Sequence, residues 1–236
     1  MVPKLPKRLQ VIAELVEQGS TVADVGTDHG YLPAYLINTS KVPLVYAGDI
    51  VRGPLNSAAL TMEKYGVPHQ KVHLLLSDGL QSFPKGCASC IIIAGMGYGS
   101  IKDILESCNW IKSDKVKLIL QPQNHHETMR EYLYQSGFGI EKEVAVEEQG
   151  HMYTVMQAVY TGEKKTIDRV FAYCGRILDS VSEDQTAYIR HQISRLNKQK
   201  QGLMQSSSQE DRSKVHELEI LTDGISLELK KIEMCE

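Results

Sequence analysis

The chain has 236 residues, of which 42% are hydrophobic, and a formal net charge of −3 at pH 7. This composition excludes an intrinsically disordered protein, and the length allows one α/β domain with a small appendage. No apolar run approaches the roughly 20 residues of a membrane helix, and the basic N-terminus lacks the apolar core of a signal peptide. Five cysteines, an odd number, fit a reducing compartment, so we expect a cytoplasmic protein with no membrane partner.

Apolar and β-branched runs predict five strands, at residues 21–25, 44–49, 72–76, 90–94 and 116–120. Helices are expected at 7–18, from Tyr31 onward, and from about Pro54 to Gly66. Apolar strands that alternate with helices form a parallel sheet covered on both faces. Two later runs, near 138–147 and 152–160, predict an antiparallel pair that closes the sheet. The fold class is therefore α/β.

The composition changes after Gly162, where β-branched runs end. Apolar residues then recur at helical spacing, first at Ile189, Ile193, Leu196 and Leu203, and again at Leu218, Leu221, Ile225, Leu229 and Ile232. This pattern predicts a helical hairpin of two or three helices with coiled-coil-like seams. Ser207 and Glu210 are typical of a capping box at the start of the second long helix. We therefore divide the chain into domains at 1–161 and 162–236.

Residues 22–32 join the first strand to the next helix through a glycine-containing turn. Gly26 lets the backbone approach a ligand, and Gly30 lets the helix start close to the sheet. Strand–turn–helix segments of this kind hold nucleotide-like ligands. Asp24 and Asp28 would repel a pyrophosphate and attract a cation. The loop therefore favours S-adenosyl-L-methionine (SAM) over a dinucleotide.

Acidic or glycine residues also end the next three predicted strands. Asp49 can accept hydrogen bonds from ribose hydroxyls, and Asp78 can accept one from an adenine amino group. The run Gly95-Met96-Gly97 lets backbone and a soft side chain lie against the ligand. Each residue is a weak signal alone. Together, at successive strand ends where open α/β sheets bind ligands, they predict a SAM site.

These residues resemble the TrmK family, bacterial methyltransferases that act on N1 of adenine 22 in tRNA. The matching segments are 7–9, 23–33, 48–50, 53–54, 79–80, 93–97, 118–122 and 130–131. The similarity spans most of 5–160, and the tail matches the family in architecture. Three departures stand out: Asp49 replaces the family's Glu, Tyr98 replaces a second glycine, and Gln123-Asn124 follows Gln121-Pro122 where the family has Gln-Pro-Asn. The last two touch the presumed pocket of the target base.

The resemblance implies a class I Rossmann-like methyltransferase domain with a C-terminal helical domain. It also implies SAM as the cofactor, tRNA as the partner, and methylation at N1 of an adenine in the D-arm. The implied cofactor residues are Asp24, Gly26, Thr27, Asp28, His29, Tyr31, Asp49, Ile50, Asp78, Gly79, Gly95, Met96 and Gly97. Arg8 either reaches the methionine carboxylate of the cofactor or lies on the solvated surface. We expect a monomer.

Adenine N1 carries an in-plane lone pair, so no proton need be removed before attack, and catalysis needs mainly positioning and tolerance of positive charge. N1 lies on the pairing edge, so the base must be unpaired or flipped out. We expect Gln121, Gln123 or Asn124 to hydrogen-bond that edge, and Asp28 or its loop to support the developing cation. No metal is expected, because the Cys87–Cys90 pair lacks a second ligand pair at zinc-site spacing.

The two tail helices differ in charge. Residues 185–209 contain no acid and four strong bases, Arg190, Arg195, Lys198 and Lys200, whereas acids outnumber bases eight to four from Glu210 onward. One interpretation is ion pairing between two antiparallel helices. The other is a basic arm that follows tRNA phosphates. Both can hold, because a helix has two sides.

Three alternatives to a tRNA methyltransferase remain open. The first is a SAM-dependent methyltransferase that acts on another RNA base or a small molecule. The second is a non-catalytic RNA-binding relative. This alternative is favoured by Tyr98 and by the shifted Gln123-Asn124. The third, a dinucleotide oxidoreductase, is disfavoured because Asp28 replaces the middle glycine of the usual fingerprint.

Overall fold

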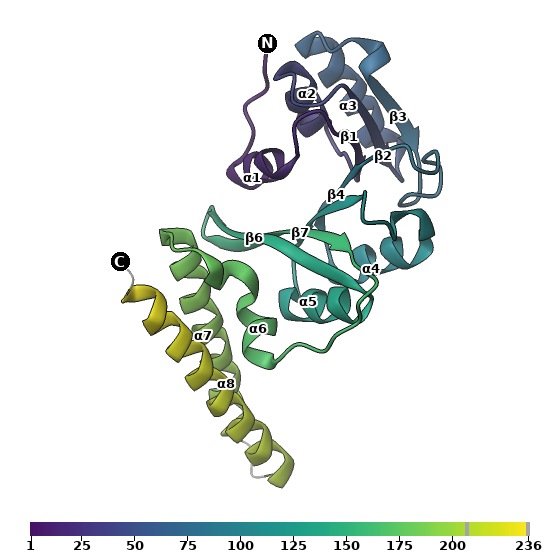
Figure 1. The fold of residues 1–236 in the computed structure, drawn as a ribbon. Helices are drawn as coiled ribbons and strands as arrows, with labels where there is room; N and C mark the ends of the chain where they lie inside the picture. Colours follow the sequence, from purple (N-terminus) through teal and green to yellow (C-terminus); the bar gives the residue numbers. More distant parts are fainter. Residues whose placement is uncertain (206–207, 235–236) are drawn as a thin grey trace.

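A seven-stranded sheet forms the centre of the computed structural model, which describes residues 1–205 and 208–234 (Figure 1). The strands are β1 (Thr21–Val25), β2 (Leu44–Asp49), β3 (Val72–Leu76), β4 (Cys90–Met96), β5 (Lys117–Pro122), β6 (Phe138–Glu148) and β7 (His151–Tyr160). Their spatial order is β3-β2-β1-β4-β5-β7-β6. The first five strands are parallel, and β7 pairs antiparallel with both β5 and β6. The predicted parallel sheet with an antiparallel closing pair is confirmed.

Helices cover both faces of this sheet. They are α1 (Lys7–Leu15), α2 (Tyr31–Asn38), α3 (Arg52–Tyr65), α4 (Tyr98–Ser107) and α5 (His126–Gln135). In β4, Ile91 and Ile93 pack in the core that includes α4 and α5, whereas Ile92 packs in the core that includes α1, α2 and α3. All three side chains are fully buried because successive residues of a strand point to opposite faces. Within the described residues, none of the helices combines the length and apolar character needed to cross a membrane.

Some predicted boundaries differ from the structure. The first helix ends at Leu15 rather than residue 18, because Val16 has an extended backbone. Strands β4 and β5 run two residues further than predicted, through Met96 and Pro122, with a register shift between Ala94 and Met96. This extension brings the residues that follow both strands into the same region.

The strand order creates a crevice between β1 and β4. From β1 the chain continues to β2 and β3 on one side, then returns to β4 on the other side. Connections therefore leave the carboxyl ends of β1 and β4 in opposite directions, and the space between them is open to a ligand.

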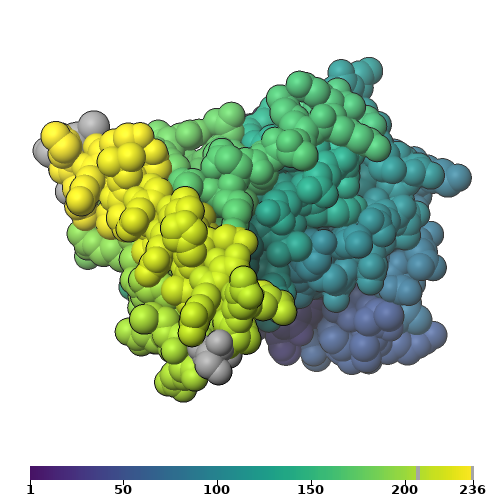
Figure 2. Space-filling model, turned by 90° about the horizontal axis from the view of Figure 1, so that it is seen from below, coloured from purple at the N-terminus to yellow at the C-terminus, as the bar shows by residue number. Residues whose placement is uncertain are grey.

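The C-terminal part of the chain consists of helices α6 (Arg169–Cys174), α7 (Glu183–Leu203) and α8 (Gln209–Glu233). Helices α7 and α8 run antiparallel and form one flank of the molecule (Figures 1 and 2). Their apolar faces share a core with Ala145 of β6 and Cys174 of α6, and this core contains Ile189 and Leu196 from α7 and Leu218 and Ile225 from α8. Helices thus lie where the spacing of apolar residues predicts them.

The cap of α8 differs from the prediction. Its N-cap is Ser208, whose hydroxyl accepts a hydrogen bond from the amide of Asp211 at 3.0 Å. The predicted cap, Ser207, lies outside the described residues.

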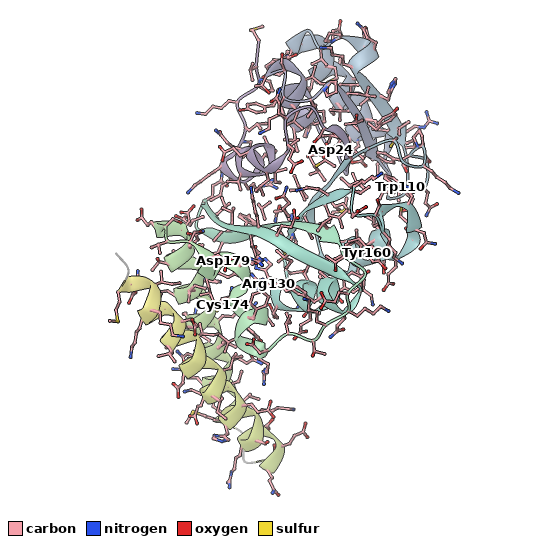
Figure 3. The ribbon with its side chains drawn as sticks, viewed as in Figure 1. Asp24, Trp110, Arg130, Tyr160, Cys174 and Asp179 are labelled. Atoms are coloured by element: carbon pink, nitrogen blue, oxygen red, sulfur yellow. The ribbon has the colours of Figure 1, made fainter. Side chains whose placement is uncertain are left out.

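A buried ion pair joins these helices to the sheet. Arg130 of α5 donates to the Glu143 carboxylate of β6 at 2.8 and 2.9 Å, and both side chains are fully buried (Figure 3). The same guanidinium donates to the hydroxyl of Tyr188 in α7 at 3.0 Å and to the carbonyl of Ala172 in α6 at 2.6 Å. Thr154 of β7 donates to Glu143 at 2.7 Å. Five elements therefore meet at one buried ion pair, to which each of them contributes a charged or hydrogen-bonding group.

Replacing Arg130 by Ala is expected to lower the free energy of unfolding by about 3–5 kcal/mol, because Glu143 would remain buried without a counter-ion. Urea denaturation followed by circular dichroism measures this change. Arg169→Ala serves as the control, because its ion pair with Glu217 is exposed and contributes under about 1 kcal/mol. Equal losses for the two variants would contradict the assignment.

Candidate functional site

Two cavities meet at the carboxyl ends of β1 and β4. The first has a volume of about 460 Å³ and the second about 310 Å³. Both volumes are in the range of small-molecule sites, roughly 300–1,000 Å³. The first is lined by Val25, Gly26, Asp49, Ile50, Ser77, Asp78, Gly79, Gln81, Met96, Ser100, Asp103, Ile104 and Ser107. The second is lined by Arg8, Leu9, Asp24, Gly26, Thr27, Asp28, His29, Tyr31, Leu32, Ala94, Gly95 and Gln123. Gly26 lines both.

The boundary between the cavities depends on Gly26. This residue has φ 76°, a conformation that side chains disfavour, and a Cβ placed on it would collide with Cε of Met96. A side chain at this position would therefore displace the end of Met96, which lines the first cavity. The role of Gly30 differs from the prediction. A Cβ placed on this residue would meet Ala58 and Met62 of α3. Gly30 therefore permits close packing between helices and not against the sheet.

The first cavity combines carboxylates with an exposed apolar surface. Asp49 ends β2 and accepts a hydrogen bond from the Val51 amide at 2.9 Å through Oδ1. Asp78 follows β3 and accepts from Gln81 at 3.4 Å. Ile50, between them on the wall, is 64% exposed. Acceptors beside an apolar surface suit a ligand with hydroxyl or amino groups on a flat ring.

The second cavity contains a buried acid, Asp24, at 5% exposure. Burial raises the pKa of this carboxyl to about 6; the Thr27 hydroxyl opposes the rise, and the nearby Asp49 adds to it. Within residues 1–205 and 208–234, no lysine, arginine or histidine forms an ion pair with Asp24. A buried carboxylate without a counter-ion attracts a cationic ligand. The exposed Asp28 carboxylate, 3.6 Å from the His29 ring, adds negative charge at the rim.

Arg8 lies over the second cavity and is held from several sides. Its Nε donates to Glu148 at the end of β6 at 3.2 Å, and its Nη1 donates to Gln121 at 3.4 Å. The guanidinium lies 5.9 Å from the ring centre of Tyr153 in β7. Arg8 therefore lines the second cavity, and its predicted contact with the methionine carboxylate of the cofactor stays a prediction. Nothing in the sequence indicated Glu148 and Tyr153, because they lie far along the chain.

Gln121, the first of the three predicted base-binding residues, is fully buried in the protein. Its Oε1 accepts from the Gly95 amide at 3.1 Å and from Arg8, while its Nε2 donates to the Pro122 carbonyl at 3.1 Å. Gln121 therefore supports the loop after β4 and does not line either cavity. Gln121 was predicted to hydrogen-bond the target base, and in the structure its side chain has this supporting role instead.

The other two candidates lie in the loop after β5. Gln123 lines the second cavity, and its amide donates to the Met96 carbonyl at 2.9 Å. The Asn124 side chain accepts from the Tyr98 amide at 3.0 Å, which satisfies a free amide at the start of α4. Gln123 is thus directed to the cavity, while Asn124 is exposed beside it and joins the loops after β4 and β5.

Tyr98 lines neither cavity. Its ring contacts His125 and Tyr132 edge-on at 6.5 and 6.3 Å and packs against the core of α4 and α5. The departure from the family pattern at this position therefore does not narrow the site.

The structure brings together twelve of the thirteen predicted cofactor residues, as lining of the two cavities; Gly97 lines neither. It also adds lining residues that the sequence did not indicate, among them Ser77, Ser100 and Asp103. The last two lie on α4, a helix that the sequence analysis did not predict.

Three of the four basic residues predicted to bind RNA form ion pairs within the protein. Arg190 pairs with Glu233 at 2.7 Å, Arg195 with Glu127 at 3.0 Å, and Lys200 with Glu219 at 3.6 Å. Two of these pairs link α7 to α8, as the ion-pairing interpretation predicts. The third links α7 to α5. Lys198 is exposed.

Comparison with known proteins places these features in a family. A family model described as a methyltransferase domain matches residues 5–156. The tRNA (adenine(22)-N(1))-methyltransferase of Bacillus subtilis is 41% identical over 155 residues, an alignment that covers 66% of this chain and 65%, less than two thirds, of that relative's length.

Solved structures extend the similarity to the whole chain. The crystal structure of the B. subtilis m1A22 tRNA methyltransferase TrmK has a TM-score of 0.78 at 31% identity, covering 96% of this chain and 99% of that one. Streptococcus pneumoniae Sp1610, solved in complex with S-adenosyl-L-methionine, has a TM-score of 0.73 at 30% identity, covering 98% and 99%. With a methyltransferase model over most of its sheet and full-length similarity to TrmK, the chain belongs to the TrmK family.

Proposed function

We propose that this protein is a SAM-dependent tRNA (adenine-N1)-methyltransferase that acts on adenine 22 in the D-arm. The observation that carries the proposal is the pair of cavities joined at Gly26, one with ring- and hydroxyl-binding groups and one with the buried acid Asp24. The relatives support the specific reaction, since the B. subtilis protein carries this activity in its name.

The residues of the site fit SAM in two parts. In the first cavity, Asp49 would accept from the ribose hydroxyls, Asp78 and Gly79 would receive the adenine edge, and Ile50 would cover its face. In the second cavity, Asp24 would pair with the ammonium group, while Gly26, Thr27, Asp28, His29 and Tyr31 would form the surrounding wall. Gly95, Met96 and Gly97 form the loop between the two parts. When bound, SAM supplies an electrophilic methyl group on a sulfonium.

The protein's own contribution to catalysis is positioning. Gln123, with Asn124 beside it, would hydrogen-bond the pairing edge of a flipped adenine and direct N1 toward the second cavity. Asp28 and Asp24 supply negative charge where the base becomes cationic. Arg8 is fixed by Glu148 and Gln121 at the mouth, where it can bind a carboxylate or a phosphate.

The C-terminal helices would bind the body of the tRNA. We propose that 162–236 act as a helical domain next to the methyltransferase domain at 1–161, and that the outward face of α7 contacts phosphates through Arg190, Lys198 and Lys200. Ion pairs with acids of α8 reduce the charge that Arg190 and Lys200 can offer. A monomer in the cytoplasm, where tRNA is modified, is the state we propose.

Incubation of unmodified tRNA with labelled SAM is expected to yield N1-methyladenosine, identified by mass after digestion to nucleosides. A tRNA in which adenine 22 is replaced should accept no label. Label on other nucleosides, or binding of SAM without transfer, would favour the alternative methyltransferase or the non-catalytic relative.

The affinity for S-adenosylhomocysteine is expected to fall about tenfold between pH 8 and pH 5, because the raised pKa of Asp24, about 6, means that this carboxyl is protonated below pH 6. Isothermal titration calorimetry across this range measures the change. Asp24→Asn should bind weakly at every pH. A pH-independent affinity of the unaltered protein would contradict the role of Asp24.

The same shift has a stability consequence. The folded state holds the proton of Asp24 more tightly than the unfolded state, so stability of the ligand-free protein falls as pH rises from about 4 to 6. Asp24→Asn should therefore raise the free energy of unfolding at pH 8 by about 3 kcal/mol while it weakens ligand binding.

Lys198→Glu is expected to weaken tRNA binding and to reduce the slope of log Kd against log salt by about 1, because one phosphate contact is lost. Lys230→Glu on α8 is the matched control, since that lysine is also exposed but lies on the acidic helix. Equal salt slopes for Lys198→Glu and the unaltered protein would remove Lys198 from the interface.

A further inference from the structure

Side chains of helix α7 contact the first turn of α5, which follows the loop 123–125 that connects β5 to α5. Arg195 of α7 pairs with Glu127 of α5, with 3.0 Å between Nη2 and Oε2. About two turns away along α7, the Tyr188 ring stacks on His126 at 5.9 Å, and its hydroxyl is 3.2 Å from Nδ1 of that histidine. The first two residues of α5 are therefore both held by α7.

The Arg195–Glu127 pair is more sheltered than the Arg190–Glu233 pair of the same helix. Its side chains are 40% and 18% exposed, against 62% and 37% for Arg190–Glu233. Burial acts to raise the pKa of Glu127, but its own backbone amide and Arg195 outweigh this effect and hold the pKa below its ordinary value. The Arg195 guanidinium also lies 5.4 Å from the Tyr173 ring centre, so its orientation is fixed from a second side.

The loop itself is short and constrained at its other end. Only three residues separate Pro122, the last of β5, from His126, the first of α5. Gln123 is bonded to Met96 and Asn124 to Tyr98, both in the segment after β4. His125 adopts φ 52°, a left-handed conformation that is unfavourable for a side chain and persists only where its surroundings enforce it.

We propose that the Arg195–Glu127 pair positions the loop 123–125 for the target base, so that α7 fixes both the tRNA-facing arm and the base-binding loop. The proposal rests on the proposed function. Both residues act through the loop and touch neither the cofactor nor the base. Since α5 begins at His126, a shift of its first turn moves Gln123 and Asn124 relative to the cavity, and misplacement by about 1 Å can lower a rate about a hundredfold.

A different role for Arg195 is direct contact with a tRNA phosphate, and Glu127 distinguishes the two. If Arg195 binds phosphate, removal of the Glu127 charge frees the guanidinium and leaves tRNA binding equal or tighter. If the pair positions the loop, loss of either partner has the same effect on turnover. Glu127→Gln is therefore expected to leave tRNA binding equal or tighter if Arg195 binds phosphate, and to lower turnover if the pair positions the loop.

The test uses Glu127→Gln, Arg195→Gln and the double variant in steady-state assays with unmodified tRNA. Each single variant is expected to lower kcat about tenfold with KM for tRNA changed less than twofold, and the double variant should be no slower than either single one. The Kd for S-adenosylhomocysteine should stay unchanged. Arg169→Gln, which breaks an ion pair with Glu217 between α6 and α8, is the matched control and should keep full kcat.

A normal kcat for Glu127→Gln, or an effect of Arg195→Gln confined to KM, would overturn the positioning role. Losses that multiply in the double variant would also overturn it, because the two residues would then act independently. Failure of the unaltered protein to methylate tRNA would instead refute the proposed function. A general loss of structure is recognised by a weaker affinity for S-adenosylhomocysteine, which a defect confined to the loop does not cause.

Discussion

The ion pair between Arg130 and Glu143 is the contact on which the arrangement of the whole chain depends. It lies where α5, β6, β7, α6 and α7 converge. Each of the three guanidinium nitrogens of Arg130 donates a hydrogen bond within the protein. A buried pair of charges is weakly stabilising in itself, but its geometry permits one relative placement of the elements that supply its partners. The sheet and the helical arm are therefore fixed against each other by hydrogen-bond geometry as well as by apolar packing.

The site depends on the opposite condition, a buried charge that has no protein partner. Asp24 is as deeply placed as the residues of the core, and its raised pKa reflects the cost of ionising it there. A cationic ligand offsets that cost. The surrounding fold must therefore be stable enough to retain a carboxylate in an unfavourable environment until the ligand arrives, which is typical of binding sites.

The sheet and most of the cofactor site could be predicted because their signals are local. A strand that ends in an acid, as at Asp24 and Asp49, shows its character within a few residues, and parallel strands bring such ends together. Contacts between distant segments could not be predicted in this way. Gln121 was expected at the base and instead supports Gly95 and Arg8. The ion-pairing interpretation predicted a partner on the other tail helix for Arg195, but this residue pairs with Glu127 of α5, since charge alone does not reveal which neighbour a helix faces.

The position of β7 between β5 and β6 affects how the protein folds during its synthesis. Until the last strand is synthesised, β5 has one unpaired edge, and the five parallel strands form an incomplete sheet. Arg8 also cannot form its ion pair until Glu148, which lies 140 residues further along the chain, has been synthesised. Such distant contacts slow folding and leave a strand edge exposed to aggregation in the meantime. The nascent chain therefore cannot complete the mouth of its candidate site before the β6–β7 hairpin has been made.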